Sequence, residues 1–327
     1  METTQSDLVA KPAQVGQMRS AQTVAADLRA QILNTIRGKS EAVDLALTTL
    51  LSGGHLLVED LPGVGKTLLA RSIAVSVGGA LGRVQCTPDL LPSDITGTSV
   101  FQPVTGEWQF RHGPIFANVV LVDEINRASP RTQAALLEPM EEAQVTVDGT
   151  SWQLPEPFFC IATQNPFGQI GTFPLPESQL DRFSLVLSMG LPDRVAEREI
   201  ITGTGGVDAL SSLRAVTTPE ELSGVIQSVR AVHCDDKIIE YVLDLVGATR
   251  TDPRLSQGAS PRATTSLVGL SKARATVAGR DYVTPDDVQA VFVGALAHRV
   301  LLAGRVDTSG ASDVLIWLLS QVSVPRP

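Results

Sequence analysis

The segment from Leu56 to Thr67 constrains the fold more than any other stretch of the chain. Its apolar start, Leu56-Leu57-Val58, leads into a short loop that ends in Gly65-Lys66-Thr67, and an apolar helix pattern follows. This order of strand, glycine-containing loop and helix is the setting that identifies a P-loop. Gly63 and Gly65 would let backbone N–H groups approach phosphate oxygens, and the helix N-terminus adds roughly half a positive charge there. A tight turn without a ligand is the less favoured alternative.

The side chains of this loop have distinct predicted roles. Lys66 would neutralise the β- and γ-phosphates of a nucleotide, and the Thr67 hydroxyl would hold Mg²⁺. Asp60 stands where the general eight-residue pattern has a glycine. The residues predicted to contact the nucleotide in this segment are Pro62, Gly63, Val64, Gly65, Lys66, Thr67 and Leu68.

Composition limits the class of protein. The chain has 327 residues, enough for one large or two moderate domains, and 43% of them are hydrophobic. A net charge of −9 argues against a surface that binds nucleic acid broadly. The chain has three cysteines, Cys86, Cys160 and Cys234. Their odd number argues against a disulfide framework, and the absence of CxxC spacing argues against a metal site. Neither a signal peptide nor a membrane span is apparent, since the apolar run from Val314 to Leu319 is too short, so we expect a cytoplasmic protein without direct membrane insertion.

Strand and helix patterns alternate along the first two thirds of the chain. Helical periods begin at Ala21 and again near Val43. Apolar runs predict strands at 56–58, 119–122, 158–162 and 185–187, and residues 83–86 are a further short strand candidate. Strands alternating with helices predict an α/β fold with a parallel sheet.

Two hairpins and one helix break are also predicted. Residues 100–101 and 108–110 flank Thr105-Gly106, which indicates a small hairpin, although a surface loop closed by aromatic residues is equally compatible. Gln144 to Leu154 alternates around Asp148-Gly149, a strong hairpin signal. Pro139 would remove a backbone hydrogen bond, so we expect a helix to kink or stop there.

The chain divides after Gly190-Leu191-Pro192. Beyond this point the helix-start signals Thr218-Pro219, Ser260-Pro261 and Thr284-Pro285 recur. We therefore predict a flexible arm over residues 1–20, an α/β nucleotide-binding core over 21–190 and a smaller all-helical lid over 191–327.

Polar residues follow two of the buried strands. Asp123 and Glu124 come directly after 119–122, at the edge where open parallel sheets bind ligands. Asp123 would hold Mg²⁺ through water, and Glu124 would orient or deprotonate the attacking water. Asn165 follows the strand at 158–162, where it could share that water or simply open a turn before Pro166. An acidic pair alone could equally cap a helix, but its position downstream of a P-loop favours the catalytic interpretation.

Two arginines are candidates for stabilising charge on the γ-phosphate. Arg182 lies just before the last strand, and Arg262 lies in the first turn of a lid helix, where a cation opposes the helix dipole. An arginine finger contributes about 10³–10⁵ in rate to phosphoryl transfer. A surface ion pair would explain either residue if the preceding motifs were absent.

The chain resembles the MoxR family of AAA+ ATPases over roughly residues 30–320. The resemblance rests on segments spread through the whole of this range. They are Leu61-Pro62-Gly63-Val64-Gly65-Lys66-Thr67, Thr87-Pro88-Asp89-Leu90-Leu91-Pro92-Ser93-Asp94, Gly113-Pro114-Ile115-Phe116-Ala117, Asp123-Glu124-Ile125-Asn126-Arg127-Ala128-Ser129-Pro130, Gln144-Val145-Thr146-Val147-Asp148-Gly149, Ala162-Thr163-Gln164-Asn165-Pro166, Leu175-Pro176-Glu177, Leu180-Asp181-Arg182-Phe183 and Gly258-Ala259-Ser260-Pro261-Arg262.

The resemblance implies a P-loop AAA+ core with a five-stranded parallel sheet between helices, a helical lid, and a ring, usually a hexamer, with ATP and Mg²⁺ at each interface. It makes Lys66 and Thr67 Walker A, Asp123 and Glu124 Walker B, and Asn165 sensor 1. It makes Arg182 the arginine finger and Arg262 sensor 2, acting on its own or a neighbouring ATP. It assigns Ile36-Arg37-Gly38 to adenine contact, and residues 101–110 and 145–154 to surfaces that face a partner or the pore. The family tolerates an acidic residue at Asp60 and usually has alanine at Pro139.

The function that this resemblance implies is an ATP-hydrolysing chaperone-like remodeller. It would mature or activate client proteins together with a partner that contains a von Willebrand A domain. The motor subunit of a magnesium chelatase and a nucleotide-gated scaffold with little turnover remain alternatives. A nucleic-acid motor is disfavoured by the net charge of −9.

Overall fold

The computed structural model describes residues 19–165, 171–202, 206–304 and 310–325. Most of the predicted N-terminal arm, residues 1–18, lies outside these ranges, as does Pro166. Arg19 is described, and it forms ion pairs with Asp27 and with Glu221 in the second half of the chain.

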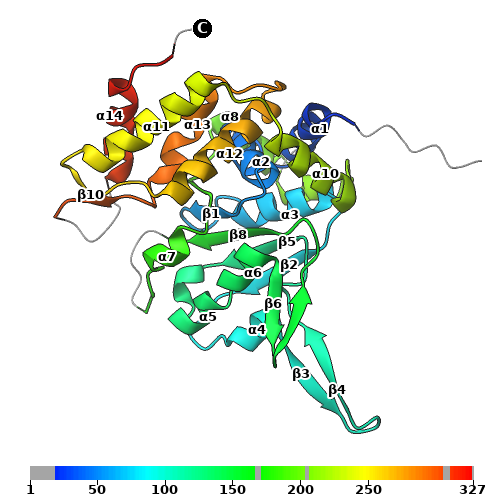
Figure 1. The fold of residues 1–327 in the computed structure, drawn as a ribbon. Helices are drawn as coiled ribbons and strands as arrows, with labels where there is room; N and C mark the ends of the chain where they lie inside the picture. Colours follow the sequence, from blue (N-terminus) through cyan, green and yellow to red (C-terminus); the bar gives the residue numbers. More distant parts are fainter. Residues whose placement is uncertain (1–18, 166–170, 203–205, 305–309, 326–327) are drawn as a thin grey trace, which may run out of the picture.

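A five-stranded parallel sheet forms the centre of the first half of the chain, as predicted (Figure 1). The strands follow the order β2-β5-β8-β1-β9. Their bounds are β1 Leu56–Glu59, β2 Leu81–Gln85, β5 Val119–Asp123, β8 Phe159–Gln164 and β9 Leu185–Leu187. Leu56 pairs with Ile161 on one side and Leu185 on the other, so β1 lies between β8 and the edge strand β9. This order places the carboxyl ends of β1, β5 and β8 next to one another.

Helices cover both faces because successive strand residues point to opposite sides. Leu56, Val58 and Leu121 belong to the same buried cluster as residues of α1 (Ala21–Leu33), α2 (Ser40–Leu51) and α3 (Lys66–Ser76). Leu57 and Val122 point the other way and pack with residues near α4 (Pro92–Thr96) and α6 (Leu137–Glu142). Both faces are therefore apolar, which explains the hydrophobic runs of β1, β5, β8 and β9, whereas the edge strand β2 alternates buried and exposed residues.

Both predicted hairpins are present. Strands β3 (Gly97–Gln102) and β4 (Glu107–His112) pair antiparallel and extend from the body of the molecule, and β6 (Gln144–Val147) pairs with β7 (Thr150–Gln153) beside them (Figure 1). Asp148 and Gly149 both have positive φ, 51° and 78°, as a two-residue type I′ turn requires. The rings of Phe110 and Trp152 stack with centroids 4.6 Å apart and join the two hairpins.

The helix that contains Pro139 is interrupted ahead of the proline. Helix α5 (Pro130–Ala134) ends before Ala135, and α6 begins at Leu137. A proline ring clashes with the carbonyl group four residues earlier, which is that of Ala135, so the break falls where the clash would occur. Pro139 itself lies in the first turn of α6, where the missing N–H has no cost. The expected interruption is present, displaced by about one turn.

The second half of the chain is mainly helical. Its helices are α8 (Arg194–Ile201), α9 (Val207–Leu210), α10 (Pro219–Arg230), α11 (Asp236–Thr251), α12 (Pro261–Val277), α13 (Pro285–Leu296) and α14 (Ala311–Gln321). The hydroxyl groups of Thr218 and Ser260 cap α10 and α12, as the sequence predicts. A short antiparallel pair, β10 (Leu255–Gln257) with β11 (Leu301–Leu302), is added to the expected helices. Helix α12 packs against α2, so both halves share one hydrophobic cluster.

Within the described ranges, no helix combines the length and apolar character that crossing a bilayer requires.

Candidate functional site

The loop between β1 and α3 has the geometry of a phosphate cradle. Gly63 and Gly65 have φ values of 84° and 101°, which favour glycine, and a Cβ at Gly63 would meet no atom within 4 Å. Helix α3 begins at Lys66 without a side-chain cap, so its first N–H groups remain available to an anion. The Lys66 Nζ donates to the carbonyl oxygen of Asp60 at 2.7 Å. Burial lowers the pKa of Lys66, while Asp60, Asp123 and Glu124 lie close enough to raise it in part.

Asp60 points away from this cradle. Its carboxylate accepts hydrogen bonds from the backbone N–H of Leu61 at 2.9 Å and of Gly190 at 2.7 Å, and from the Ser188 hydroxyl at 3.1 Å. Burial opposes its ionisation, but these donors prevail and lower the pKa of Asp60. The acidic residue therefore fastens the P-loop to the segment that follows β9, which explains why a charge is accommodated where the general pattern has glycine.

A cavity of about 400 Å³ opens beside the cradle. The predicted adenine-binding residues Ile36 and Arg37 line it together with residues 63–68. Pro192, Ile200 and Gly206 from the start of the second half of the chain complete the lining. Gly38 lies just outside, with a φ of 69°, and a Cβ there would approach the Cβ of Ala196 to 2.6 Å. Residues 36–37 and 63–68 thus converge on one cavity, whereas Gly38 and Pro62 are not part of its lining.

The acidic pair lies at the carboxyl edge of the sheet, next to the P-loop. Asp123 is only 7% exposed at the end of β5. Glu124 has a left-handed backbone, with φ 55°, and its N–H donates to the Thr163 hydroxyl at 2.9 Å. The Glu124 carboxylate forms an ion pair with Arg127 at 2.9 Å. A positive φ at a non-glycine residue is strained, and such strain concentrates at functional sites.

Asn165 is brought to the same edge by strand order. It follows β8, which pairs with both β1 and β5, and its carbonyl oxygen accepts a hydrogen bond from Asn126 at 3.3 Å. The P-loop, Asp123, Glu124 and Asn165 therefore share one edge of the sheet.

Arg182 and Arg262 are not part of that group. Arg182 precedes β9, and β9 begins beside the start of β1, whereas the P-loop follows the end of β1. Arg262 lies with Arg182, because both form ion pairs with Glu141, and the Arg262 distance is 2.7 Å. Neither arginine is among the described residues that line the cavity at the P-loop. The two arginines thus lie at the opposite end of the strands from the P-loop of their own chain.

Three further residues at these sites had no sequence signal. Arg83 on β2 forms an ion pair with Asp123 at 2.9 Å, which depends on the pairing of β2 with β5. The Lys39 Nζ donates to the carbonyl oxygens of Val64 and Gly190 and so joins the P-loop to the segment after β9. Glu141 meets its arginines only through tertiary packing, since 121 residues separate it from Arg262.

The residues present fit a magnesium nucleotide. The open backbone at Gly63, the uncapped helix and Lys66 suit phosphate oxygens. A threonine hydroxyl and a buried carboxylate are hard oxygen ligands of the kind that Mg²⁺ uses together with phosphates. The cavity beyond them, about 400 Å³, has the size of a small-molecule site.

Comparison with known proteins agrees with this geometry. Residues 55–185 match the family described as "ATPase family associated with various cellular activities (AAA)", and residues 247–314 match the AAA lid domain. The chain is 44% identical to the uncharacterised protein YeaC of Bacillus subtilis, over 88% of this chain and 91% of that protein. It is 38% identical to Chaperone MoxR1 of Mycobacterium tuberculosis, over 90% and 81% of the two chains.

Two further matches extend the agreement. Protein MoxR of Methylorubrum extorquens is 32% identical, over 85% of this chain and 88% of its own. The crystal structure of a predicted ATPase from Cytophaga hutchinsonii superposes with a TM-score of 0.85 at 31% identity, covering 94% and 96% of the two chains. The similarity thus spans both halves of the chain in sequence and in structure. The protein belongs to the MoxR family of AAA+ ATPases.

Proposed function

We propose that the protein hydrolyses ATP in a ring, usually a hexamer, in which each nucleotide lies between two copies of the chain. One observation carries this proposal. The P-loop edge holds Asp123, Glu124 and Asn165, while Arg182 and Arg262 pair with Glu141 at the other end of the strands. A catalytic site that needs both the residues at the P-loop edge and the two arginines is therefore incomplete within one subunit. A head-to-tail interface supplies the second group from a neighbour and closes into a ring.

Within such a site each side chain has a role. Residues 62–68 and Lys66 bind the phosphates, Ile36, Arg37 and Gly38 hold the adenine, and Thr67 with Asp123 holds Mg²⁺. Bound Mg²⁺ neutralises charge on the β- and γ-phosphates. Glu124 orients the water and accepts its proton at the carboxylate, while Asn165 holds the same water in line.

Glu124 and Asp123 must first change partners. Glu124 is paired with Arg127, and Asp123 with Arg83, in the described structure. The Glu124–Arg127 pair is exposed on both sides, and pairs of this kind contribute only about 0–1 kcal/mol, so Glu124 can leave it readily. Asp123 is buried, and there Mg²⁺ would replace the charge that Arg83 supplies.

The work done with ATP is remodelling of other proteins. The relative from M. tuberculosis is named a chaperone, and the resemblance to the MoxR family supports a partner with a von Willebrand A domain and a separate client. The exposed Phe101, Val104 and Trp108 of the β3–β4 hairpin are suited to contact such a protein. Crosslinking with a Glu124→Gln variant, which should bind ATP without turning it over, would capture both.

A subunit-mixing experiment tests the shared site. Arg182→Ala and Glu124→Gln variants should each be nearly inactive alone. Co-expressed in equal amounts, they should recover activity at about one quarter of interfaces, where an intact P-loop edge meets an intact arginine pair. A mixture as inactive as its components, although the two variants co-purify as one assembly, would refute the shared site.

A second mixture decides whether Arg262 acts on its own or a neighbouring ATP. If both arginines come from the same subunit, Arg182→Ala mixed with Arg262→Ala should stay inactive, since every interface lacks one guanidinium group. Recovery in this mixture would instead place Arg262 on the nucleotide of its own chain. Steady-state phosphate release by the unaltered protein, with Glu124→Gln as the blank, separates a motor from a nucleotide-gated scaffold.

A further inference from the structure

Glu141 occupies a central place between the two arginines. It is the penultimate residue of α6, and its two carboxylate oxygens are divided between them: Oε2 pairs with Arg182, and Oε1 accepts from Arg262 at 2.7 Å. The Glu141 side chain is 34% exposed, so the cluster is reachable from solvent but not fully screened by it. The roles proposed above for nucleotide binding, Mg²⁺ binding and water activation do not include Glu141.

The guanidinium groups around Glu141 repel one another. Burial lowers the pKa of Arg182, and the charge of Arg262 lowers it further. Arg299 stands behind them, 4% exposed, with its pKa lowered to about 10 by burial despite an ion pair with Asp181 at 3.0 Å. Asp181 also approaches Arg262, at 3.8 Å. Without Glu141, Arg262 and Arg299 would share Asp181, and Arg182 would keep its hydrogen bond to the Ser178 carbonyl oxygen but lose its carboxylate partner.

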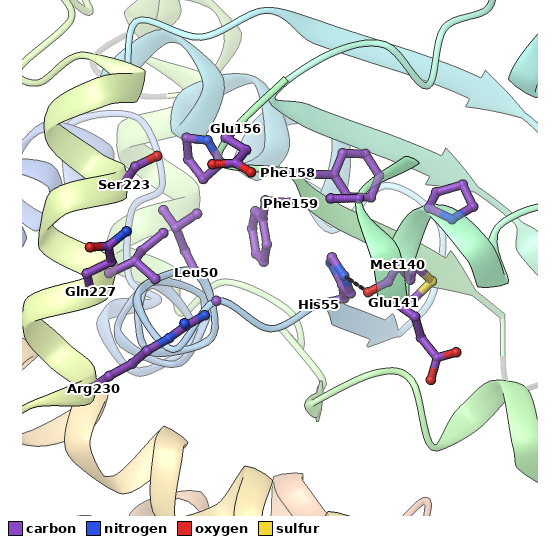
Figure 2. A pocket seen from close by; sticks show the side chains of 15 residues that line it. Leu50, His55, Met140, Glu141, Glu156, Phe158, Phe159, Ser223, Gln227 and Arg230 are labelled. Atoms are coloured by element: carbon purple, nitrogen blue, oxygen red, sulfur yellow. Dashed lines mark hydrogen bonds between the residues drawn. The ribbon is translucent and has the colours of Figure 1, made fainter. Parts of the chain in front are cut away.

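The backbone that carries Glu141 is fixed to the sheet. The His55 Nε2 lies 2.9 Å from the carbonyl oxygen of Met140, and the His55 Nδ1 accepts from the N–H of Cys160 at 3.1 Å. His55 therefore donates through Nε2 and anchors α6 to β8. Figure 2 shows this bond at the wall of a cavity between α6 and α10, with the Glu141 side chain directed away from the cavity. The backbone next to Glu141 is thus held in place, while the Glu141 carboxylate lies between the two arginines.

We propose that Glu141 is a positioning residue that holds Arg182 and Arg262 together as one unit, directed at the nucleotide of the neighbouring subunit. This inference rests on the proposed function, because it assigns to that unit the task of stabilising the γ-phosphate. Glu141 touches neither the nucleotide nor the water. It acts by offsetting the repulsion between two guanidinium groups, so that both can meet the same anion.

The test compares Glu141→Gln with Glu142→Gln by steady-state ATP hydrolysis. Glutamine keeps hydrogen-bonding groups but removes the charge. Glu142 makes the control closely matched, since it is the next residue of α6 and its carboxylate accepts from Gln144 at 3.0 Å. We expect Glu141→Gln to lower kcat by about 10- to 100-fold, as misplaced catalytic groups do. The KM for ATP should stay within about twofold, because the binding edge is remote.

Two further variants separate positioning from a structural role. Glu141→Asp, which restores the charge on a shorter side chain, should recover part of kcat. Adding Glu141→Gln to Arg182→Ala should lower kcat by less than about threefold more, because only one of the two guanidinium groups remains and there is no repulsion between them to offset. Thermal unfolding of each variant should match the unaltered protein within a few degrees.

Three results would overturn the inference. The first is an unchanged or increased kcat in Glu141→Gln. The second is a loss of kcat in Glu142→Gln as large as that in Glu141→Gln. The third is a double variant, Glu141→Gln with Arg182→Ala, whose loss of kcat equals the product of the two single losses. If Arg182→Ala itself keeps full activity, the shared site fails and this inference with it. If Arg182→Ala is inactive while Glu141→Gln is fully active, only the role of Glu141 is wrong.

Discussion

Replacing Asp60 with asparagine should destabilise the protein well beyond the effect of losing one surface charge. The carboxylate is 7% exposed and accepts three hydrogen bonds, from Leu61, Ser188 and Gly190. An amide has a single accepting oxygen. If that oxygen serves Ser188 and Gly190, the NH₂ group faces the N–H of Leu61, so one hydrogen bond is lost and two become neutral. Hydrogen bonds to charged groups contribute about 1.5–3 kcal/mol and neutral ones about 0.5–1.5.

One lost charged bond and two that become neutral give an expected loss in the free energy of unfolding of about 3–6 kcal/mol at pH 7. Denaturant-induced unfolding without nucleotide measures it. Asp27→Asn is the control, because Asp27 forms one ion pair with Arg19 and both side chains are exposed, 45% and 37%. Its loss should be at most about 1 kcal/mol.

The pH dependence gives an independent check on the same carboxylate. The hydrogen bonds hold the pKa of Asp60 below its usual 3.8, so the stabilisation is present above that value and disappears as the pH falls through the folded-state pKa. The difference between Asp60→Asn and the unaltered protein should persist from pH 7 to pH 4 and shrink below. A loss no larger than that of Asp27→Asn, or a difference that is insensitive to acid, would refute the argument.

Three further predictions concern stability. Burial lowers the pKa of His55 to about 4, whereas the unfolded chain binds a proton near 6.5, so stability should fall by up to about 3 kcal/mol between pH 6.5 and 4. His55→Gln should flatten this part of the stability–pH profile, and an unchanged slope would contradict it. Gly82→Ala should cost about 1–3 kcal/mol, since its Cβ would lie 1.8 Å from the carbonyl oxygen of Pro114. Gly247→Ala, with open space and a position inside α11, should instead raise the melting temperature slightly.

The locally coded features of the protein could be predicted from the sequence. The strands β1, β5, β8 and β9 are apolar runs because both faces of the sheet are covered, and Asp148-Gly149 favours a type I′ turn by itself. Helix starts at Thr218 and Ser260 depend on a hydroxyl group and an N–H three residues away. The P-loop likewise needs only residues 56–67 to specify strand, cradle and helix.

Partners across the fold could not be predicted in this way. Arg83 meets Asp123 because β2 pairs with β5, and residue types alone do not fix a strand order. The role of Asp60 depends on where the chain after β9 passes the P-loop. Pro139 was expected to interrupt a helix, but the position of the break follows from the carbonyl group of Ala135 rather than from the proline's own place.

The sequence alone predicted an edge of the sheet suited to a nucleotide, because Lys66 and Thr67 end a P-loop pattern and Asp123 and Glu124 directly follow an apolar strand. Only the tertiary structure decided how the arginines are arranged. Arg182 and Arg262 are distant in the chain, and each could pair with a surface carboxylate. The fold brings the turn before β9 and the first turn of α12 to one carboxylate, Glu141 of α6, and separates both arginines from the P-loop of their own chain.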